Sequence, residues 1–121
     1  MTISKQDLIN GLDHFYGSEI FYYQPMYSQY RYTEGVKYLA ENAGAYWLLD
    51  YIFSNQSEPS IKAEEFQVWE IALGNDSNAV IRVEDGNKNK VKHFDLTFTD
   101  FPLDKYSLWF VNGTLLLPSE Y

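Results

Sequence analysis

The sequence has no cysteine, so it forms neither disulfide bonds nor thiolate metal sites, and its composition favours a reducing compartment. It also lacks a long hydrophobic run. The longest, residues 45–53, is far shorter than the roughly 20 residues that a membrane-spanning helix needs. The first residues show neither the basic start nor the apolar stretch of a secretory signal peptide. Together these absences predict a cytoplasmic protein that does not cross a membrane.

Basic residues are scarce. The chain has 9 Lys and Arg against 17 Asp and Glu, which gives a formal net charge of -8 at pH 7. The acidic residues occur along the whole sequence and form no acidic tail. A chain of this charge repels phosphate backbones, so direct binding to nucleic acid is not expected. The charge instead favours a protein partner with a basic surface.

Motifs for catalysis and metal binding are also missing. The two histidines, His14 and His93, are far apart in sequence and lie in no ligand-spaced motif. The turn DGNKN, residues 85–89, resembles the start of a calcium loop, but Lys90 and Leu96 stand where a glycine and a bidentate glutamate are needed. No nucleophile motif and no glycine-rich phosphate loop occur. The sequence therefore favours a non-enzymatic protein without a cofactor or metal.

Hydrophobic and aromatic residues are abundant, at 45% and 18% of the chain, and tyrosine is the commonest aromatic with 11 residues. Disordered chains are poor in aromatic residues, so this composition predicts a folded chain. A length of 121 residues fits one domain spanning 1–121.

The N-terminal half is predicted to be helical. Ser4 and Thr33 are good N-caps for two helices, of which the second is expected to run to Phe53. Apolar residues at spacings of three and four begin this second helix, and its end is apolar all round, which predicts burial on several sides. Gly44 lies in its middle and indicates a kink or a close contact with a neighbouring backbone.

The C-terminal half is predicted to form strands. Alternating apolar and polar residues indicate strands over 66–73, 79–84 and 91–98, and Asn112-Gly113 indicates a hairpin between 107–111 and 114–118. Residues 15–32 are expected to form an irregular, partly ordered loop that wraps the core, with residues 20–23 as a candidate edge strand. Helices followed by consecutive strands predict an α+β fold, with N-terminal helices packed on one face of a four- to five-stranded antiparallel meander sheet.

The best candidate for a binding surface is the tyrosine-rich segment over residues 15–32. Its candidate binding residues are Tyr22, Tyr23, Tyr27, Tyr30 and Tyr32. Tyrosine is enriched at binding hot spots because its ring gives a large contact area at low entropic cost. The alternative is that these rings close the end of the core as a lid. Their stacking on single-stranded nucleic acid is a further alternative, although the segment has only one basic residue, Arg31.

A second candidate is a pocket between the long helix and the sheet, lined by Tyr46, Asp50 and Trp69. If Asp50 is buried there, its pKa would rise and the carboxyl group could serve as an acid or base. This hypothesis describes a small-molecule-binding domain or minor enzyme. The alternative for Asp50 is a position at the edge of the helix, solvated, ion-paired or bonded to a tyrosine hydroxyl.

Several sequence blocks carry a resemblance to a known family. They are YLAENAGAYWLLDYI (38–52), FQVWEI (66–71), VEDGN (83–87), TDFPLD (99–104) and LWFVNGTLLLPSEY (108–121). From about Tyr27 to its end, the chain resembles a family of small uncharacterised bacterial proteins, common in cyanobacteria and on phages and plasmids. The resemblance implies an accessory or mobile-element origin and brings no catalytic residues. Our leading hypothesis is a non-enzymatic protein that binds another macromolecule, including an anti-defence role such as inhibition of a CRISPR effector.

Overall fold

The computed structural model describes residues 4–16 and 20–121, and within them the chain forms a mixed α+β fold. The helices are α1 (Lys5–Leu12), α2 (Glu34–Ala43), α3 (Tyr46–Ser54) and the short α4 (Pro59–Lys62). The strands are β1 (Phe21–Tyr22), β2 (Arg31–Thr33), β3 (Phe66–Leu73), β4 (Ala79–Asp85), β5 (Lys90–Leu96), β6 (Lys105–Val111) and β7 (Thr114–Leu116). Three 3-10 turns complete the described chain: η1 (Pro25–Tyr27), η2 (Asn55–Ser57) and η3 (Pro118–Glu120).

The strands of the described residues join in one sheet of order β1-β2-β7-β6-β3-β4-β5. The expected meander is present as β3, β4 and β5, and the Asn112-Gly113 hairpin joins β6 to β7. The prediction of four to five strands was wrong, because the sheet has seven and β2 pairs with β7 in parallel. Strands of two and three residues are too short to show a period of two in the sequence, so β2 was not recognised.

The expected single helix from Thr33 to Phe53 is also wrong, because it is broken into α2 and α3 at Gly44. Gly44 has a φ of 61°, the left-handed conformation that glycine adopts without strain at a helix end. Thr33 caps α2 as predicted, since its Oγ1 accepts a hydrogen bond from Val36 N at 3.3 Å. Ser4 does the same for α1, accepting from Asp7 N at 3.1 Å.

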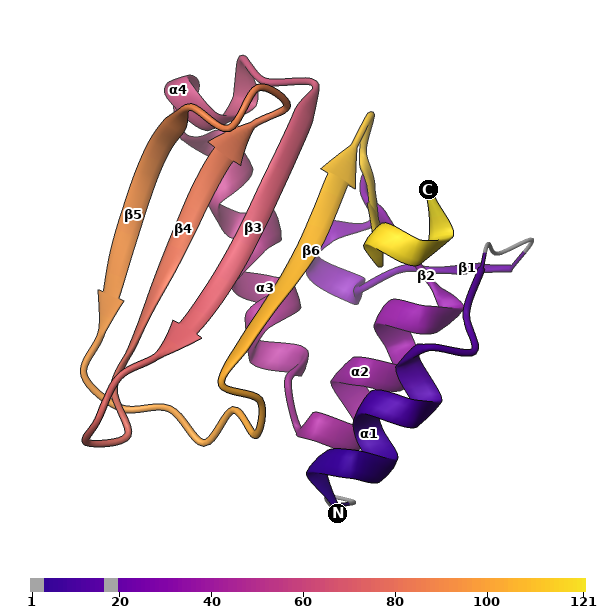
Figure 1. Cartoon of the computed structure of the whole chain (residues 1–121). Helices are drawn as coiled ribbons and strands as arrows, with labels where there is room; N and C mark the ends of the chain where they lie inside the picture. Colours follow the sequence, from indigo (N-terminus) through magenta and orange to yellow (C-terminus); the bar gives the residue numbers. More distant parts are fainter. Residues whose placement is uncertain (1–3, 17–19) are drawn as a thin grey trace.

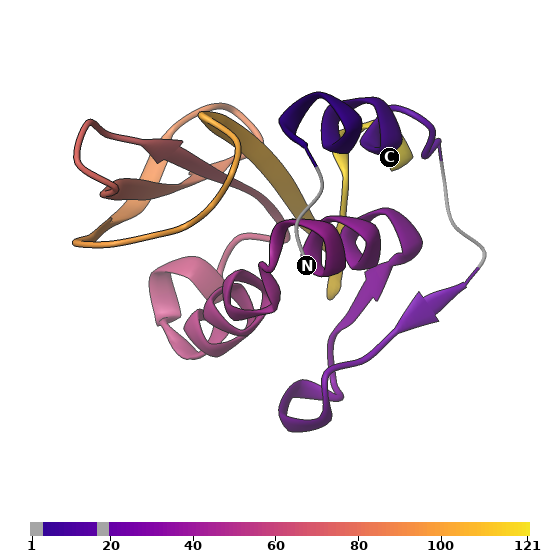
Figure 2. The same cartoon turned by 90° about the horizontal axis from the view of Figure 1, so that it is seen from below.

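The main hydrophobic core lies between α3 and one face of the sheet, here called the inner face. Figure 1 shows α3 behind β3 and β6, and Figure 2 shows α1 running along α2 beside the sheet. The core residues of α3 are Leu48, Leu49, Ile52 and Phe53, all buried. They pack with the inward side chains of the strands, among them Trp69, Ile71, Ile81 and Leu108. The opposite, outer face of β3, β4 and β5 has no described helix over it (Figure 1).

Two buried glutamines tie the segment after α3 to the sheet. The amide groups of Gln56 and Gln67 donate to each other's Oε1 at 2.9 Å. Gln67 Nε2 also donates to Ile61 O at 2.9 Å, and Gln67 Oε1 accepts from Trp69 Nε1 at 2.8 Å. The network fixes the position of η2 and α4 on the end of β3, because each buried polar group in it has a partner.

The described part of the chain contains no helix that is both long enough and apolar enough to cross a bilayer.

Candidate functional site

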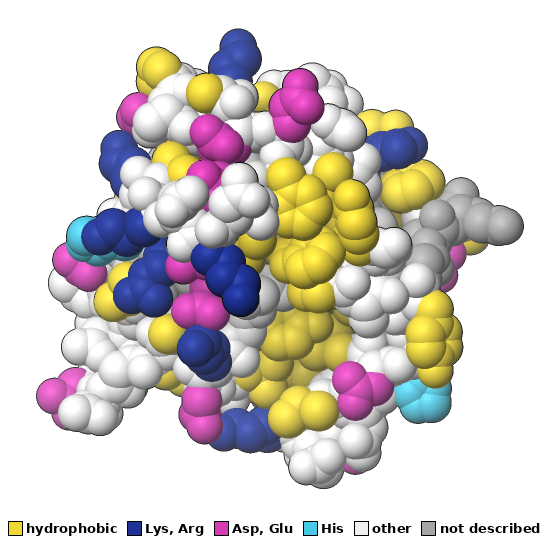
Figure 3. All heavy atoms as spheres, turned by 45° about the horizontal axis from the view of Figure 1, so that its top comes forward, with side chains coloured by type: hydrophobic (Ala, Val, Ile, Leu, Met, Phe, Trp, Pro, Cys, Tyr) yellow, Lys and Arg dark blue, Asp and Glu magenta, His cyan; other side chains and the backbone are white. Residues whose placement is uncertain are grey.

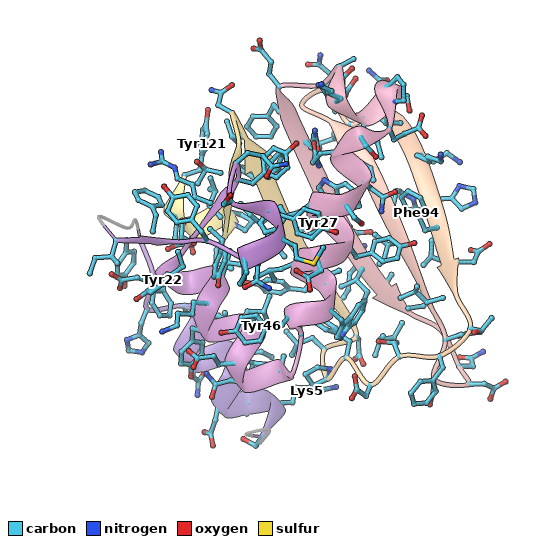
Figure 4. The ribbon with its side chains drawn as sticks, turned by 180° about the vertical axis from the view of Figure 1, so that it is seen from behind. Lys5, Tyr22, Tyr27, Tyr46, Phe94 and Tyr121 are labelled. Atoms are coloured by element: carbon cyan, nitrogen blue, oxygen red, sulfur yellow. The ribbon has the colours of Figure 1, made fainter. Side chains whose placement is uncertain are left out.

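Three of the five candidate tyrosines lie against the core. The rings of Tyr27 and Tyr30 lie 6.1 and 5.7 Å from the ring of Phe53, and Tyr32 is only 4% exposed. Figure 4, which views the helix side, shows Tyr27 over α3. This arrangement places Tyr27, Tyr30 and Tyr32 as a lid over the end of the core, on the side of α3 away from the centre of the sheet.

The other two candidate tyrosines are more open to solvent. Tyr22 is half-buried, with its ring 5.9 Å from that of Tyr32 and the Lys37 ammonium group 4.5 Å above it. Tyr23 is 56% exposed, and the neighbouring Met26 is 82% exposed. The large exposed side chains of the tyrosine-rich segment are thus Tyr16, Ile20, Tyr23 and Met26.

The structure does not bring Tyr46, Asp50 and Trp69 to one place. Tyr46 and Asp50 are exposed on α3, whereas Trp69 is 2% exposed on the inner face of β3. Asp50 Oδ1 accepts a hydrogen bond from Gln24 Nε2 at 3.0 Å, and Gln24 Oε1 accepts one from the Tyr32 hydroxyl at 3.1 Å. Asp50 therefore lies at the edge of the helix, which is the alternative position considered from the sequence. Gln24 bridges its carboxylate to the Tyr32 hydroxyl.

The space between α3 and the sheet is nearly filled. The void there, lined by Leu48, Ile52, Trp69 and Leu108 among others, measures about 10 Å³. A volume of this size holds at most one water molecule. A small-molecule ligand would need the core to open.

The surroundings of the tyrosines near α3 favour their protonated form. Burial raises the pKa of Tyr32, and the charges of nearby groups, including Asp50, raise it further. Burial raises the pKa of Tyr46 as well, with a contribution from Glu41. Both phenols therefore stay protonated around neutral pH, and the Tyr32 hydroxyl donates to Gln24 Oε1. Neither is tuned toward the role of a general base.

No metal-binding group emerges from the described residues: nowhere do three or more His, Asp or Glu side chains gather closely enough to hold an ion. The turn that resembles a calcium loop is closed by its own aspartate. Asp85 Oδ1 accepts hydrogen bonds from the backbone N–H groups of Asn87 and Asn89 at 2.8 and 3.0 Å. These bonds lower the pKa of Asp85. They also explain why an aspartate stands at this position, because its side chain stabilises the hairpin turn.

A surface that the sequence did not single out lies on the outer face of the sheet. The rings of Phe66, Trp109 and Tyr121 pack in a triangle, with centroids 5.1, 5.3 and 5.5 Å apart. Phe66 and Trp109 are half-buried, and Tyr121 is 72% exposed. We call these three rings the outer aromatic cluster. The half-buried Val68 and Val111 extend it on the same face, and Figure 3 shows a continuous apolar area on this side of the molecule.

Charged side chains border the outer aromatic cluster. Glu70 lies 3.8 Å from Arg82 Nη1 and 3.7 Å from Lys105 Nζ, so two cations neutralise it. Glu84 lies opposite Val68 on the neighbouring strand. Glu84 has no Lys, Arg or His within ion-pair distance among residues 4–16 and 20–121. The cluster is therefore an apolar centre with a charged rim.

A signal for this surface was present in the sequence, but only in part. In FQVWEIAL and SLWFV both sets of alternating residues are largely apolar, which indicates a strand with apolar side chains on its two faces. Phe66, Val68 and Trp109 belong to the second set. Nothing in the sequence showed that Tyr121, at the far end of the chain, would fold back onto them.

The family described as a family of unknown function (DUF6876) matches residues 6–121 of this chain. No curated protein and no solved structure matches it.

Proposed function

We propose that this chain, which belongs to the family of unknown function DUF6876, is a non-enzymatic protein that binds another protein through the outer face of its sheet. The observation that carries the proposal is the outer aromatic cluster: three contacting rings beside the outer face of β3, β4 and β5, which no described helix covers. Exposed apolar patches with a polar rim are typical of protein interaction sites.

The residue types of the cluster support the same function. Tryptophan and tyrosine dominate binding hot spots because each buries a large area with few rotatable bonds. Trp109 and Tyr121 contact each other and Phe66, so part of their conformational entropy has already been lost before a partner binds. A partner that inserts an apolar side chain beside Val68 and Val111 would complete the burial of these rings.

The charges favour a partner that is basic overall. The net charge of -8 attracts a basic protein over long range. At the rim, Glu84 offers a carboxylate that forms no ion pair among the described residues. Charge complementarity of this kind raises association rates and excludes other acidic proteins.

The alternative hypotheses gain less support. A ligand site between α3 and the sheet would have to fit in about 10 Å³. Single-strand binding would require a positive groove along the aromatic rings, and the net charge of the chain is -8. A gel shift with single-stranded DNA and RNA at low salt tests the latter, and we expect no complex.

We further propose that this binding serves phage–host or plasmid–host conflict, including inhibition of a CRISPR effector. One support is the resemblance of the chain, from about Tyr27 to its end, to proteins of phages and plasmids. The other is the acidic charge, which suits a basic nucleic-acid-handling enzyme. Expression of the chain in cells that carry an active CRISPR system should restore plating of a targeted phage. Unchanged plating across several CRISPR types would contradict this role and leave the protein-binding proposal standing.

The binding proposal is tested by photo-crosslinking in cells that carry the gene naturally. The photoreactive residue p-benzoylphenylalanine is placed at position 109 on the outer face, and in a control at position 23 in the tyrosine-rich segment. We expect a discrete protein adduct from position 109. The captured protein is then identified, purified and titrated against the wild-type chain by calorimetry.

Two variants decide whether the cluster carries the affinity. W109E and the milder Y121A should each weaken binding at least about tenfold, because both remove contact area at the centre of the patch. Y23E serves as the matched control, since Tyr23 is exposed but lies away from the cluster. The proposal fails if position 109 captures nothing, or if the captured protein binds W109E and Y121A as tightly as it binds the wild type.

A further inference from the structure

A hollow lies on the outer face, at the end of the sheet formed by β1, β2 and β7. Its volume is about 300 Å³, at the lower end of the range for ligand sites. The residues that line it are Phe21, Arg31, Thr33, Val111, Asn112, Thr114, Leu116, Glu120 and Tyr121. We call it the Arg31 hollow. It combines apolar walls with one guanidinium group, and the hypotheses above use only Val111 and Tyr121 of its lining.

Arg31 is held in a fixed orientation. Its Nε donates a hydrogen bond to Thr114 Oγ1 at 2.8 Å. Its guanidinium carbon lies 4.0 Å above the centre of the Phe21 ring, a cation–π contact. These two contacts fix the plane of the group and engage Nε, so the two Nη groups remain as a pair of parallel donors.

This arginine has no acidic partner in the part of the chain that the structure describes. No carboxylate of residues 4–16 and 20–121 lies within ion-pair distance of it, although the chain has 17 Asp and Glu. Glu120 also lines the hollow, but its carboxylate accepts hydrogen bonds from Thr33 Oγ1, Gly35 N and Leu117 N. Its charge is thus engaged by donors at the N-terminus of α2 and in the C-terminal turn.

The donors and walls of the hollow select the chemistry of a ligand. Two parallel N–H donors of a fixed guanidinium match the two oxygens of a carboxylate. Glu120 and the net charge of -8 repel a dianion such as phosphate more strongly than a monoanion. Val111, Leu116 and the Tyr121 ring offer apolar contact to the rest of the ligand.

We infer that the Arg31 hollow binds an apolar monocarboxylate, with the carboxylate on the Nη groups of Arg31 and an aromatic or branched body against Tyr121 and Val111. The ligand has two sources with the same chemistry: a free small acid, or the C-terminus of a chain that ends in an apolar residue. The inference stands beyond the protein-binding proposal and does not depend on it.

The test follows the side-chain Nε–Hε signal of Arg31 by NMR during titration with sodium phenylacetate. Saturable shifts of this signal and of the Tyr121 and Val111 amides are expected, with a Kd on the order of 1 mM for so small a ligand. Phenylacetamide, which has the same shape without the charge, should cause no saturable shift. A parallel titration uses a short peptide with a free C-terminal phenylalanine and its C-terminal amide.

Variants of two arginines separate a site from general charge attraction. R31Q should abolish the saturable shifts, and R31K should weaken binding at least about tenfold, because an ammonium group lacks the parallel donors. R82Q is the matched control: Arg82 lies on the same face but is paired with Glu70. Arg31 is exposed, so the amide spectra of its variants should stay those of the folded protein.

Each outcome of the titrations decides something. Binding of phenylacetate alone assigns a free acid, binding of the peptide acid alone assigns a chain terminus, and binding of both supports the shared chemistry. The inference is overturned if neither acid binds, if the amides bind equally well, or if R31Q leaves the shifts unchanged. The inference is also overturned if R82Q weakens binding of the acid as much as R31Q does. None of these results bears on whether W109E loses its protein partner.

Discussion

At the scale of single residues, Glu120 has the largest number of specific contacts in the C-terminal turn. Its carboxylate accepts hydrogen bonds from Thr33 Oγ1 at 2.6 Å, Leu117 N at 3.0 Å and Gly35 N at 3.3 Å. It therefore lies at the N-terminus of α2, where the helix dipole favours a negative charge. Gly35 leaves room for it, since a Cβ atom there would lie 2.6 Å from Glu120 Oε1 and from Leu117 Cδ1.

The first prediction concerns this contact. E120A should lower the free energy of unfolding by about 1–3 kcal/mol, because it removes charge-assisted hydrogen bonds at a helix N-terminus. G35A should also destabilise, despite the better helix propensity of alanine. The double variant should lose less free energy of unfolding than the sum of the two single losses. Urea unfolding of the three variants measures this difference. Full additivity would mean that Gly35 and Glu120 act independently and would contradict the contact.

The second prediction concerns the pKa of Glu58. Lys92 Nζ donates a hydrogen bond to Glu58 Oε2 at 3.3 Å, and this bond and the charge of Lys92 lower the pKa of the carboxyl below 4.5. Because the folded-state value is depressed, the stability it contributes is present above pH 4.5 and is lost as the pH falls through the lowered pKa. In an NMR titration of the side-chain carboxyl, K92Q should move the pKa back up. The same pKa in K92Q and wild type would show that Lys92 is not the cause.

At the scale of secondary-structure elements, the break between α2 and α3 decides how the apolar segment is buried. Gly44 ends α2 with a positive φ, and Ala45 N then donates to Ala40 O at 2.9 Å. The new helix direction lets Leu48, Leu49, Ile52 and Phe53 of α3 face the sheet and the tyrosine lid, while Asp50 faces solvent.

The third prediction tests this break. G44A should destabilise by about 1–2 kcal/mol, because an L-residue is strained in the left-handed conformation. A Cβ atom at Gly44 would meet nothing within 4 Å, so steric contact adds no cost. Thermal unfolding measures the loss, and G44N should lose less, because asparagine tolerates this conformation better. Greater stability of G44A than of wild type would indicate one continuous helix.

The fourth prediction concerns the glutamine network that links η2 and α4 to β3. Q67L should cost about 3 kcal/mol, because it leaves the buried Trp69 Nε1 and the Gln56 amide without their partners. The variant Q56L/Q67L should recover part of this loss, since it also removes one of the orphaned groups. Equilibrium denaturation of the single and double variants provides the comparison. A change of less than about 1 kcal/mol in Q67L would be inconsistent with a buried network.

The sequence predicted those elements whose signals are local. The caps Ser4 and Thr33, the strand over residues 66–73 and the Asn112-Gly113 hairpin all depend on neighbouring residues, and all are present. What it did not predict depends on distant segments: β2 is a strand only because it meets β7, and the outer aromatic cluster forms only when Tyr121 reaches Phe66 and Trp109. Gly44 predicted a kink or a close backbone contact, but a glycine inside a helical pattern does not distinguish a kink from a complete break of the helix.

At the scale of the whole molecule, the two faces of the sheet differ. The inner face is covered by α3 and is nearly free of voids, whereas the outer face carries the outer aromatic cluster and the Arg31 hollow. The tyrosine-rich segment, the sequence's first candidate for binding, contributes Tyr27, Tyr30 and Tyr32 to the lid over Phe53. The chain therefore has two candidate contact regions, the outer face and the exposed side chains of the tyrosine-rich segment, Tyr16, Ile20, Tyr23 and Met26.

Hydrogen exchange of the complex with the crosslinked partner separates these regions most directly. We predict that the partner protects amides of residues 66–70, 105–111 and 118–121, and that exchange over 20–32 stays as in the free protein. Protection confined to 20–32, or to the exposed side of α2 and α3, would place binding on the tyrosine-rich side and contradict the assignment of the outer face.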